Sequence, residues 1–317
     1  IKYNGKINII IGNHEYDNIE VVNGGFRHII DLAEYDAGNY TIDILEAEDN
    51  DNYTFKQTTF KNNLTINKRT AEISNVNLES IVYASTNTIH VTGDITTPPY
   101  AYNYTGTITA TINGAEYKSN ASDGKFNVTV NGVKKLNADK YNVSIKGEET
   151  VNYIVCDENA SFEIVKANCG METSIANVKI DQNATVSVIL PNDATGKVIV
   201  IFNNTEYEID LANTRSIALP IAPAGTHRVS ISYDGDGNYN PAETQIRSFT
   251  VSNYNASDLQ NEINQAIANN QTELNLTHDY EFGENETAVT VNESIKINGN
   301  NHIVDANDSS GIFDITG

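Results

Sequence analysis

The stretch "AGTHRVSISYDGDGNY" (224–239) repeats, with substitutions, as "AGNYTIDILEAEDNDNY" (37–53) and "ADKYNVSIKGEETVNY" (138–153). Each copy has a turn, a ring side chain, an alternating segment, an acidic loop and a closing tyrosine. The closing tyrosine follows the ring at a nearly constant interval: Tyr40 to Tyr53, Tyr141 to Tyr153 and His227 to Tyr239. This regular spacing indicates an internal repeat. We therefore interpret the aspartates of 234–238 as part of one version of a loop that recurs in each copy.

A second block recurs in the same order, and the interval from its first Gly to its final Tyr is identical in the three copies. Its versions are "GKINIIIGNHEY" (5–16), "GTITATINGAEY" (106–117) and "GKVIVIFNNTEY" (196–207). Each has a strand pattern, a two-residue polar turn and a Glu-Tyr pair. Because the pairs recur at a strand end, we interpret them as structural and not catalytic.

Short segments of period-two alternation fill the rest of each copy, and this period is typical of strands with one buried face. About seven such strands in roughly 90 residues predict a two-sheet antiparallel immunoglobulin (Ig)-like sandwich. The turn before Tyr40 resembles the tyrosine corner of such domains, and Tyr141 fits the same pattern. His227 departs from it, which leaves the corner hydrogen bond of the third copy open.

The segment 254–317 has a different pattern. Apolar residues at 259, 263 and 267 predict a short amphipathic helix, capped by Ser257 or Asp258. Short strands separated by Asn-rich turns follow, which favour a helical cap and the first coils of a right-handed parallel β-helix, or alternatively a small α+β appendix.

The predicted fold class is therefore all-β, with tandem Ig-like sandwiches followed by a helix-capped start of a parallel β-helix. The predicted domains are 1–72 (N-terminally incomplete), 73–167, 168–253 and 254–317. The chain begins at Ile1 without a leader pattern and stops in the middle of a repeat, so we expect an internal segment of a longer protein.

The combination resembles the adhesin-like surface proteins of methanogenic archaea, which join bacterial-type Ig-like repeats to pectate-lyase-like β-helices. The resemblance is carried by the loop pattern Y-x-G-D-x-N-Y and by "INGNNHIVDAND…GIFDITG". It implies an extracellular, cell-surface protein with an adhesion or surface-filament role. Implied partners are a cell-surface glycan or protein, or neighbouring copies of the same chain.

Composition narrows the class of partner. The formal charge is −22, which disfavours nucleic acid and anionic lipid as partners. No apolar run reaches the roughly 18 residues that a membrane-spanning helix needs, so we expect no membrane insertion in this segment.

Sixteen Asn-x-Ser/Thr triplets occur, more than the frequencies of these residues predict, and this favours export and a glycoprotein. The candidate N-glycosylation sites are Asn39, Asn63, Asn103, Asn127, Asn142, Asn183, Asn203, Asn275 and Asn292.

The sequence shows no catalytic motif, and its six histidines have no metal-ligand spacing. We therefore predict no enzyme activity, no catalytic residues and no cofactor. The sole metal candidate is a loose calcium site at Asp234, Asp236 and Asn238, since the positions of an EF-hand loop are not filled. We interpret these residues first as turn formers.

Cys156 and Cys169 flank a predicted strand. A straight strand of that length would hold their sulfur atoms roughly 25 Å apart, beyond the reach of a disulfide, so free thiols are predicted.

Two alternative functions remain open at this stage. The chain could supply non-catalytic modules of a secreted polysaccharide-degrading enzyme. It could also be a carbohydrate-binding module, with Tyr100, Tyr102 and Tyr104 exposed on one face.

Overall fold

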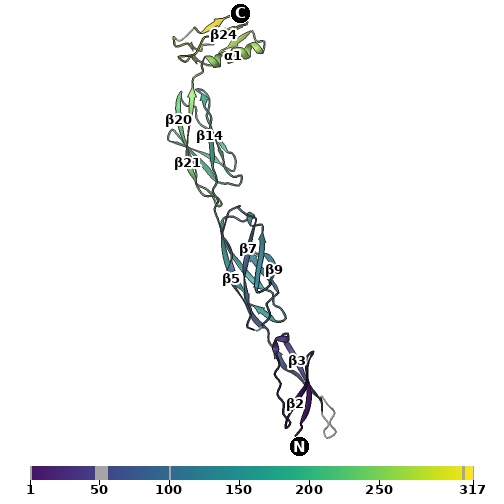
Figure 1. Ribbon diagram of the computed structural model, residues 1–317. Coiled ribbons are helices and arrows are strands. Elements are labelled where there is room, and N and C mark those ends of the chain that lie inside the picture. Colours follow the sequence, from purple (N-terminus) through teal and green to yellow (C-terminus); the bar gives the residue numbers. More distant parts are fainter. Residues whose placement is uncertain (1, 47–55, 100, 309–310, 317) are drawn as a thin grey trace. The chain divides into compact units, whose positions relative to one another are not determined.

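The computed structural model describes residues 2–46, 56–99, 101–308 and 311–316, without the side chains of 60–63 (Figure 1). The chain divides into two compact units, Ile1–Val165 and Lys166–Gly317. Strands dominate both units, and the described residues contain one α-helix. The all-β prediction is therefore confirmed. No helix among the described residues is long and apolar enough to span a membrane.

The first module of unit 1 consists of one described antiparallel sheet in the order β2-β1-β3-β4. The strands are β1 (Gly5–Ile11), β2 (His14–Val21), β3 (Gly38–Glu46) and β4 (Thr58–Ile66). A 3-10 turn, η1 (Leu32–Glu34), lies between β2 and β3. Six apolar residues are buried among the described side chains of this module: Ile7, Ile9, Ile11, Ile19, Val21 and Tyr35.

The second module of unit 1 is a two-sheet sandwich. One sheet has the order β10-β7-β5-β12 and the other β6-β13-β11-β8-β9. A core of 21 buried apolar residues separates the sheets, so this module is closed on both faces. The strands are β5 (Arg69–Asn77), β6 (Ile81–Val82), β7 (Thr88–Thr96), β8 (Thr107–Ile112), β9 (Ala115–Asn120), β10 (Lys125–Asn131), β11 (Asp139–Gly147), β12 (Tyr153–Val155) and β13 (Glu158–Val165), with the 3-10 turn η2 (Val133–Lys135) before β11.

Unit 2 opens with another sandwich, made of sheets β14-β16-β19 and β15-β21-β20-β17-β18. Its five-stranded sheet has the same plan as that of the second module, because β15 pairs parallel with β21 as β6 does with β13. The strands are β14 (Glu172–Ile175), β15 (Val178–Lys179), β16 (Thr185–Ile189), β17 (Lys197–Phe202), β18 (Thr205–Asp210), β19 (Ser216–Ala218), β20 (Gly225–Tyr233) and β21 (Ala242–Ser252). Tandem Ig-like sandwiches are thus present.

The second repeated block forms a hairpin with a two-residue turn in every module. Ile11 pairs with His14, Ile112 with Ala115 and Phe202 with Thr205. Both turn residues of the second and third hairpins have positive φ angles, which fits the type I′ turns that match strand twist. Gly and Asn tolerate this region better than other residues do, and they occupy these turns: Asn113, Gly114, Asn203 and Asn204.

The predicted tyrosine corners are also formed. The hydroxyl of Tyr40 donates to the carbonyl oxygen of Asp36 at 2.8 Å, and that of Tyr141 to the carbonyl oxygen of Asn137 at 2.9 Å. His227 makes the equivalent contact, with Nε2 2.7 Å from the carbonyl oxygen of Pro223. The question left open for the third copy is thereby answered, because an imidazole N–H takes the place of the hydroxyl.

The residues after β21 form a helix followed by two turns of parallel coil. Helix α1 (Ala256–Ala268) buries Leu259 and Ile263, and both residues belong to a core shared with the coil strands. Asn255 caps the helix, and Asp258 at the third helical position completes a capping box. The predicted cap at Ser257 or Asp258 was therefore wrong, although Asp258 takes part in the box.

The coil strands pair in three parallel couples at a nearly constant separation along the chain: Glu273 with Lys296, Tyr280 with Val304 and Val289 with Phe313. Two successive turns of chain are thus stacked strand on strand, with α1 beside them (Figure 1). The strands are β22 (Glu273–Asn275), β23 (Tyr280–Glu281), β24 (Val289–Val291), β25 (Lys296–Asn298), β26 (Val304–Asp305) and β27 (Phe313–Ile315). A longer right-handed β-helix remains a prediction.

Two of the predicted boundaries fall inside paired segments. The boundary between 72 and 73 cuts β5, which pairs with β7 and β12 of the second module, so this module begins near Arg69. The boundary between 167 and 168 separates Ala167 from its bridge partner Tyr239 in the third module. In both cases a module's first residues pair with residues far along the chain, strand β12 in one module and Tyr239 in the other, which local alternation does not reveal.

Candidate functional site

The recurring acidic loop is best seen in its third copy, where Asp236 organises the backbone around itself. Its Oδ1 accepts the N–H groups of Asn238 and Tyr239, both at 2.8 Å. Its Oδ2 accepts the N–H of Thr195 at 2.7 Å and the hydroxyl of the same residue at 2.9 Å. Burial alone would raise the pKa of Asp236, but these hydrogen bonds outweigh it and hold that pKa below its ordinary value.

This geometry weighs against the calcium hypothesis, which stays a prediction. Both carboxylate oxygens of Asp236 already accept two donors each, whereas calcium requires carboxylate oxygens aimed at the ion. Asn238 contributes its backbone to the loop, and Asp234 is exposed. Among the described ranges, no group of three or more His, Cys, Asp or Glu side chains is placed to hold a metal ion. The three residues form a turn, as the simpler interpretation predicted.

The loop also holds the start of its own module. The carbonyl oxygen of Asn152 accepts the N–H of Arg69 at 2.9 Å, and that of Asn238 accepts the N–H of Ala167 at 2.9 Å. The next residue in each loop is a buried tyrosine. Tyr153 donates its hydroxyl to the carbonyl oxygen of Tyr102, and Tyr239 donates to Asp193 at 2.7 Å. Tyr53, the matching residue of the first copy, lies outside the described residues.

The candidate glycosylation sites are on the surface. Eight of the nine asparagines are exposed: Asn39, Asn103, Asn127, Asn142, Asn183, Asn203, Asn275 and Asn292. The side chain of Asn63 lies outside the described part of the chain. Exposure is what a glycan acceptor requires, and whether any of them carries a glycan remains a prediction.

The aromatic face proposed for sugar binding is not formed. Tyr104 is fully buried and donates its hydroxyl to the carbonyl oxygen of Glu148 at 2.6 Å, whereas Tyr102 is 72% exposed. Tyr100 lies outside the described residues. Tyr104 precedes the hairpin of the second module and belongs to its core. Tyr102 and Tyr104 therefore do not share a face, and the predicted alternation of 100–104 was wrong for these two residues. Both cysteines are free, as predicted.

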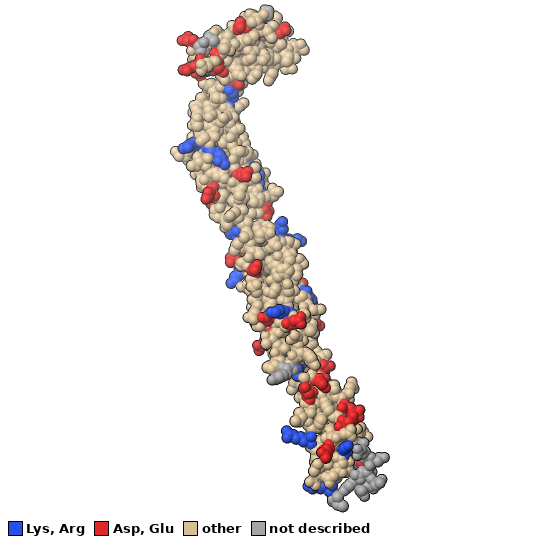
Figure 2. All heavy atoms as spheres, in the orientation of Figure 1, with Lys and Arg blue, Asp and Glu red and all other residues tan. Residues whose placement is uncertain are grey.

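The visible face of the sandwiches carries charged side chains of both signs (Figure 2). Figure 2 shows acidic and basic groups interspersed over the visible face of the sandwiches. Ion pairs between exposed side chains, such as Lys197 with Glu208, contribute little to stability.

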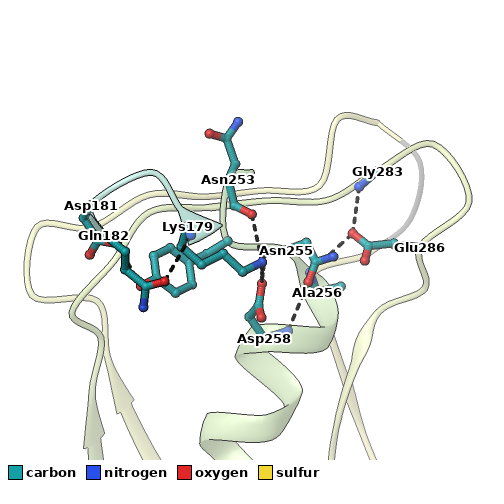
Figure 3. Close-up of polar contacts among 10 residues, drawn as sticks. Lys179, Asp181, Gln182, Asn253, Asn255, Ala256, Asp258, Gly283 and Glu286 are labelled. Carbon is teal, nitrogen blue, oxygen red and sulfur yellow. Dashed lines mark hydrogen bonds and ion pairs between the residues drawn. The ribbon is translucent and has the colours of Figure 1, made fainter. Parts of the chain in front are cut away.

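The most elaborate polar site lies in unit 2, where the third sandwich meets the helix cap. Figure 3 shows Lys179 of β15 reaching the carbonyl oxygen of Asn253 and the carboxylate of Asp258. The Nζ atom of Lys179 also lies 5.4 Å from the centre of the Tyr254 ring, within cation–π range. Asp258 is the capping-box residue of α1, so one lysine joins the sandwich to the first turn of the helix.

A cleft of about 460 Å³ lies next to this junction. The rings of Tyr254 and His278 stack in it with centroids 3.9 Å apart, and Asp181 binds both of them. The Tyr254 hydroxyl donates to Oδ1 of Asp181 at 3.0 Å, and His278 Nδ1 lies 3.0 Å from Oδ2. Burial and the nearby Asp181 carboxylate raise the pKa of Tyr254 to about 12, so its hydroxyl stays protonated and can donate.

The rest of the cleft combines apolar and acidic groups. Ile180 and Ile303 are 40% and 65% exposed there, and His302 lies 3.1 Å from Oδ1 of Asp279. Hydrogen bonds from the N–H of Ile303 and from His302 lower the pKa of Asp279. A carboxylate with a lowered pKa does not suit a general acid, so Asp279 is fitted to accept hydrogen bonds. The carboxylates lining the cleft are Asp181, Asp279, Glu281 and Asp305.

Sequence reasoning did not find this cleft. His278 and His302 were interpreted as scattered, but the parallel coil places them in successive turns. The period of the coil was the one signal in the sequence that could have brought them together, because the two histidines are one turn of chain apart.

No protein-family model and no curated protein matches this sequence. Among solved structures, the chain is similar to a two-domain fibronectin type-III segment of chicken tenascin, at 13% identity and a TM-score of 0.33, over 56% of this chain and 99% of that one. It is also similar to a structure of a 1.5-MDa bacterial ice-binding adhesin, at 16% identity and 0.26, over 80% and 86%. A third similar structure is the adhesin InvE of Yersinia pseudotuberculosis, at 11% identity and 0.29, over 58% of each chain. All three TM-scores are below 0.5, so the assignment of tandem Ig-like sandwiches rests on the strand pairing.

Proposed function

We propose that this chain is a segment of an extracellular, adhesin-like surface protein. The sandwich modules act as spacers, and the helix-capped coil is the element they display. The supporting observation is the repeated closure of each complete module by its own loop, with Asn152 bound to Arg69 and Asn238 bound to Ala167. A module that ties down its own first residues can be added in series without changing its neighbour.

The junction between the first two modules supports the spacer role. The side chain of Asn152 accepts the N–H of Ala37 and donates to the carboxylate of Asp36, both at 2.7 Å. One amide thus binds the turn that precedes the tyrosine corner of the first module. Consecutive modules usually move relative to one another, and these two hydrogen bonds would restrain that motion.

The attachment role can be tested with beads that carry the chain through its N-terminus. We expect these beads to be retained on at least one surface from a panel of microbial cells and polysaccharides. Free chain should compete with the retention, and beads coated with an unrelated sandwich protein should not be retained. Equal retention of both bead types on every surface would refute the proposal.

The archaeal source, the glycans and a longer right-handed β-helix belong to the same proposal. The source comes from the family resemblance, the glycans from the Asn-x-Ser/Thr triplets, and the β-helix from the pattern of residues 254–317. Mass spectrometry of the protein from its natural source tests the glycans directly. We expect hexose-type mass additions at exposed acceptors such as Asn203 and Asn292. Unmodified peptides at all nine candidate positions would remove the glycoprotein part of the proposal.

A second candidate function is carbohydrate binding at the cleft beside Lys179, either in an adhesin or in the non-catalytic part of a polysaccharide-degrading enzyme. The observation that favours it is the Tyr254–His278 stack beside exposed isoleucines and hydrogen-bond acceptors. Sugars offer an apolar face and hydroxyl donors, which suits this lining. We expect His278→Ala to weaken the glycan-array signals. Tyr102→Ala, at an exposed tyrosine of unit 1, is the control and should leave them unchanged. Equal signals from the two variants would exclude the cleft as the binding site.

A further inference from the structure

The first module has an apolar face that the other two modules cover with a second sheet. A groove of about 330 Å³ lies along this face. It is lined by Ile9, Ile11, Ile42 and Ile44 of the sheet and by Phe26, His28 and Ile30 of the segment that follows β2. Among the described side chains, six apolar residues of this module are buried, compared with 21 in the second module.

The segment 26–30 occupies the place that β10 takes in the second module. Both follow a tight bridge, Val22 with Gly25 in one module and Ser122 with Lys125 in the other. Both precede a 3-10 turn and then a tyrosine corner. Phe26, His28 and Ile30 therefore correspond to Phe126, Val128 and Val130.

The two segments differ in one respect. β10 pairs along its whole length with β7, whereas residues 26–30 belong to no strand, and Phe26 and Ile29 are 44% and 79% exposed. Their alternation is that of a strand, with 26, 28 and 30 on the groove side. The segment has the pattern of a strand and no described counterpart of β7 to pair with.

We propose that the open face of the first module is a strand acceptor, completed by a β7-like strand of the same polypeptide N-terminal to Ile1 that runs antiparallel to residues 26–30. The source follows from the topology of the complete modules. In both of them the facing sheet includes strands that come directly before the hairpin: β5 and β7 before β8, and β14 and β16 before β17. The face is therefore the counterpart of an interface that this chain forms twice.

The register of β7 on β10 defines the sequence that the incoming strand needs. Phe126 lies opposite Gly93, Val128 opposite Val91 and Val130 opposite Ile89. A Cβ atom at position 93 would lie 2.6 Å from the Phe126 ring, so any residue other than glycine there would force that ring to move. We therefore expect a five-residue pattern in the incoming strand. Its first and third residues are β-branched, its fifth is a glycine opposite Phe26, and its second and fourth can be any residue.

The acceptor is tested with a synthetic peptide of residues 86–97, "TNTIHVTGDITT", which carries this pattern. Added to the intact chain, it should slow hydrogen exchange of the backbone amides at 26–30 at least tenfold. A Gly93→Val peptide is the matched control and should give no protection. Equal protection by the two peptides, or protection by neither, would overturn the proposed register.

A variant of the protein checks the face itself. His28→Asp places a charge in the groove and should weaken peptide binding at least tenfold, because burying an unpaired carboxylate is unfavourable. Arg27→Asp carries the same charge on the other side of the segment and should leave binding unchanged. Equal effects of the two substitutions would show that the groove is not the binding face.

The source of the strand is tested in cis. A copy of residues 69–103 is added ahead of Lys2, so that the transplanted strands precede the first hairpin as they do in the second module. We expect protection of 26–30 without added peptide, in a monomeric particle. Unprotected amides at 26–30 would overturn the proposal. Protection in the unextended chain together with dimer formation would also overturn it, because the occupant would then be a second copy.

Discussion

His227 Nε2 lies 2.7 Å from the carbonyl oxygen of Pro223, so an imidazole closes the same turn that a tyrosine hydroxyl closes in the other two modules. The ring also contacts Phe202 and Phe249, at centroid distances of 5.9 and 5.4 Å. His227 therefore combines a hydrogen bond to the turn with a place in the aromatic core.

The corner can be tested by substituting this ring. His227→Phe keeps the aromatic contacts and removes the hydrogen bond, so we expect it to lower the free energy of unfolding by about 1 kcal/mol. For a domain of this size that loss lowers the melting temperature by about 4–8 °C in calorimetry. His227→Tyr should unfold like the wild type, and an equal loss for both would show that the hydrogen bond contributes nothing.

Asp236 predicts a pH dependence of the third module. Because its pKa in the folded state is lowered, its contribution to stability is complete above the unfolded value of about 3.9 and is lost as the pH falls through the folded value. We expect the melting temperature to fall as the pH drops below about 5, through the protonation range of the unfolded carboxyl group. Asp236→Asn should be less stable at pH 7 and less sensitive to acid. Asp234→Asn, which changes an exposed carboxylate of the same loop, is the control, and its melting temperature should follow that of the wild type across this pH range.

The occupied carboxylate of Asp236 also predicts insensitivity to calcium. Its oxygens accept four donors from Thr195, Asn238 and Tyr239, so binding an ion there would require breaking these hydrogen bonds. Melting temperatures measured with excess calcium and with EDTA should agree. Calcium-dependent stabilisation that Asp236→Asn abolishes would restore the metal site.

Lys179 should couple the sandwich to the helix cap. Its side chain and that of Asp258 are 24% and 27% exposed, so their ion pair is shielded more than the surface pairs are. We expect Lys179→Met to destabilise the docking of α1 by on the order of 1–2 kcal/mol and to speed proteolysis between 252 and 256. Lys296→Met is the control, since Lys296 is 70% exposed in its pair with Glu273. Equal cleavage rates in the two variants would rule out this coupling.

The sequence by itself determined the repeat, the strand patterns, the hairpin turns and the helix. These features depend on neighbours close along the chain: alternation fixes which face of a strand is apolar, and glycine or asparagine supplies the positive φ angles at Asn113, Gly114 and Asn203. The corner tyrosines were predictable for the same reason, because the accepting carbonyl lies in the turn just before each ring.

Only the tertiary structure decided the features that depend on distant partners. Thr195 donates to Asp236 across 41 positions along the chain, which gives this carboxylate a structural role that the sequence did not reveal. Coil stacking brought His278 and His302 into one cleft, and Tyr104 entered the core instead of the surface. Residues 26–30 also depend on a distant partner. Their pattern is compatible with a strand, but a strand forms only where another strand pairs with it, as β7 pairs with β10.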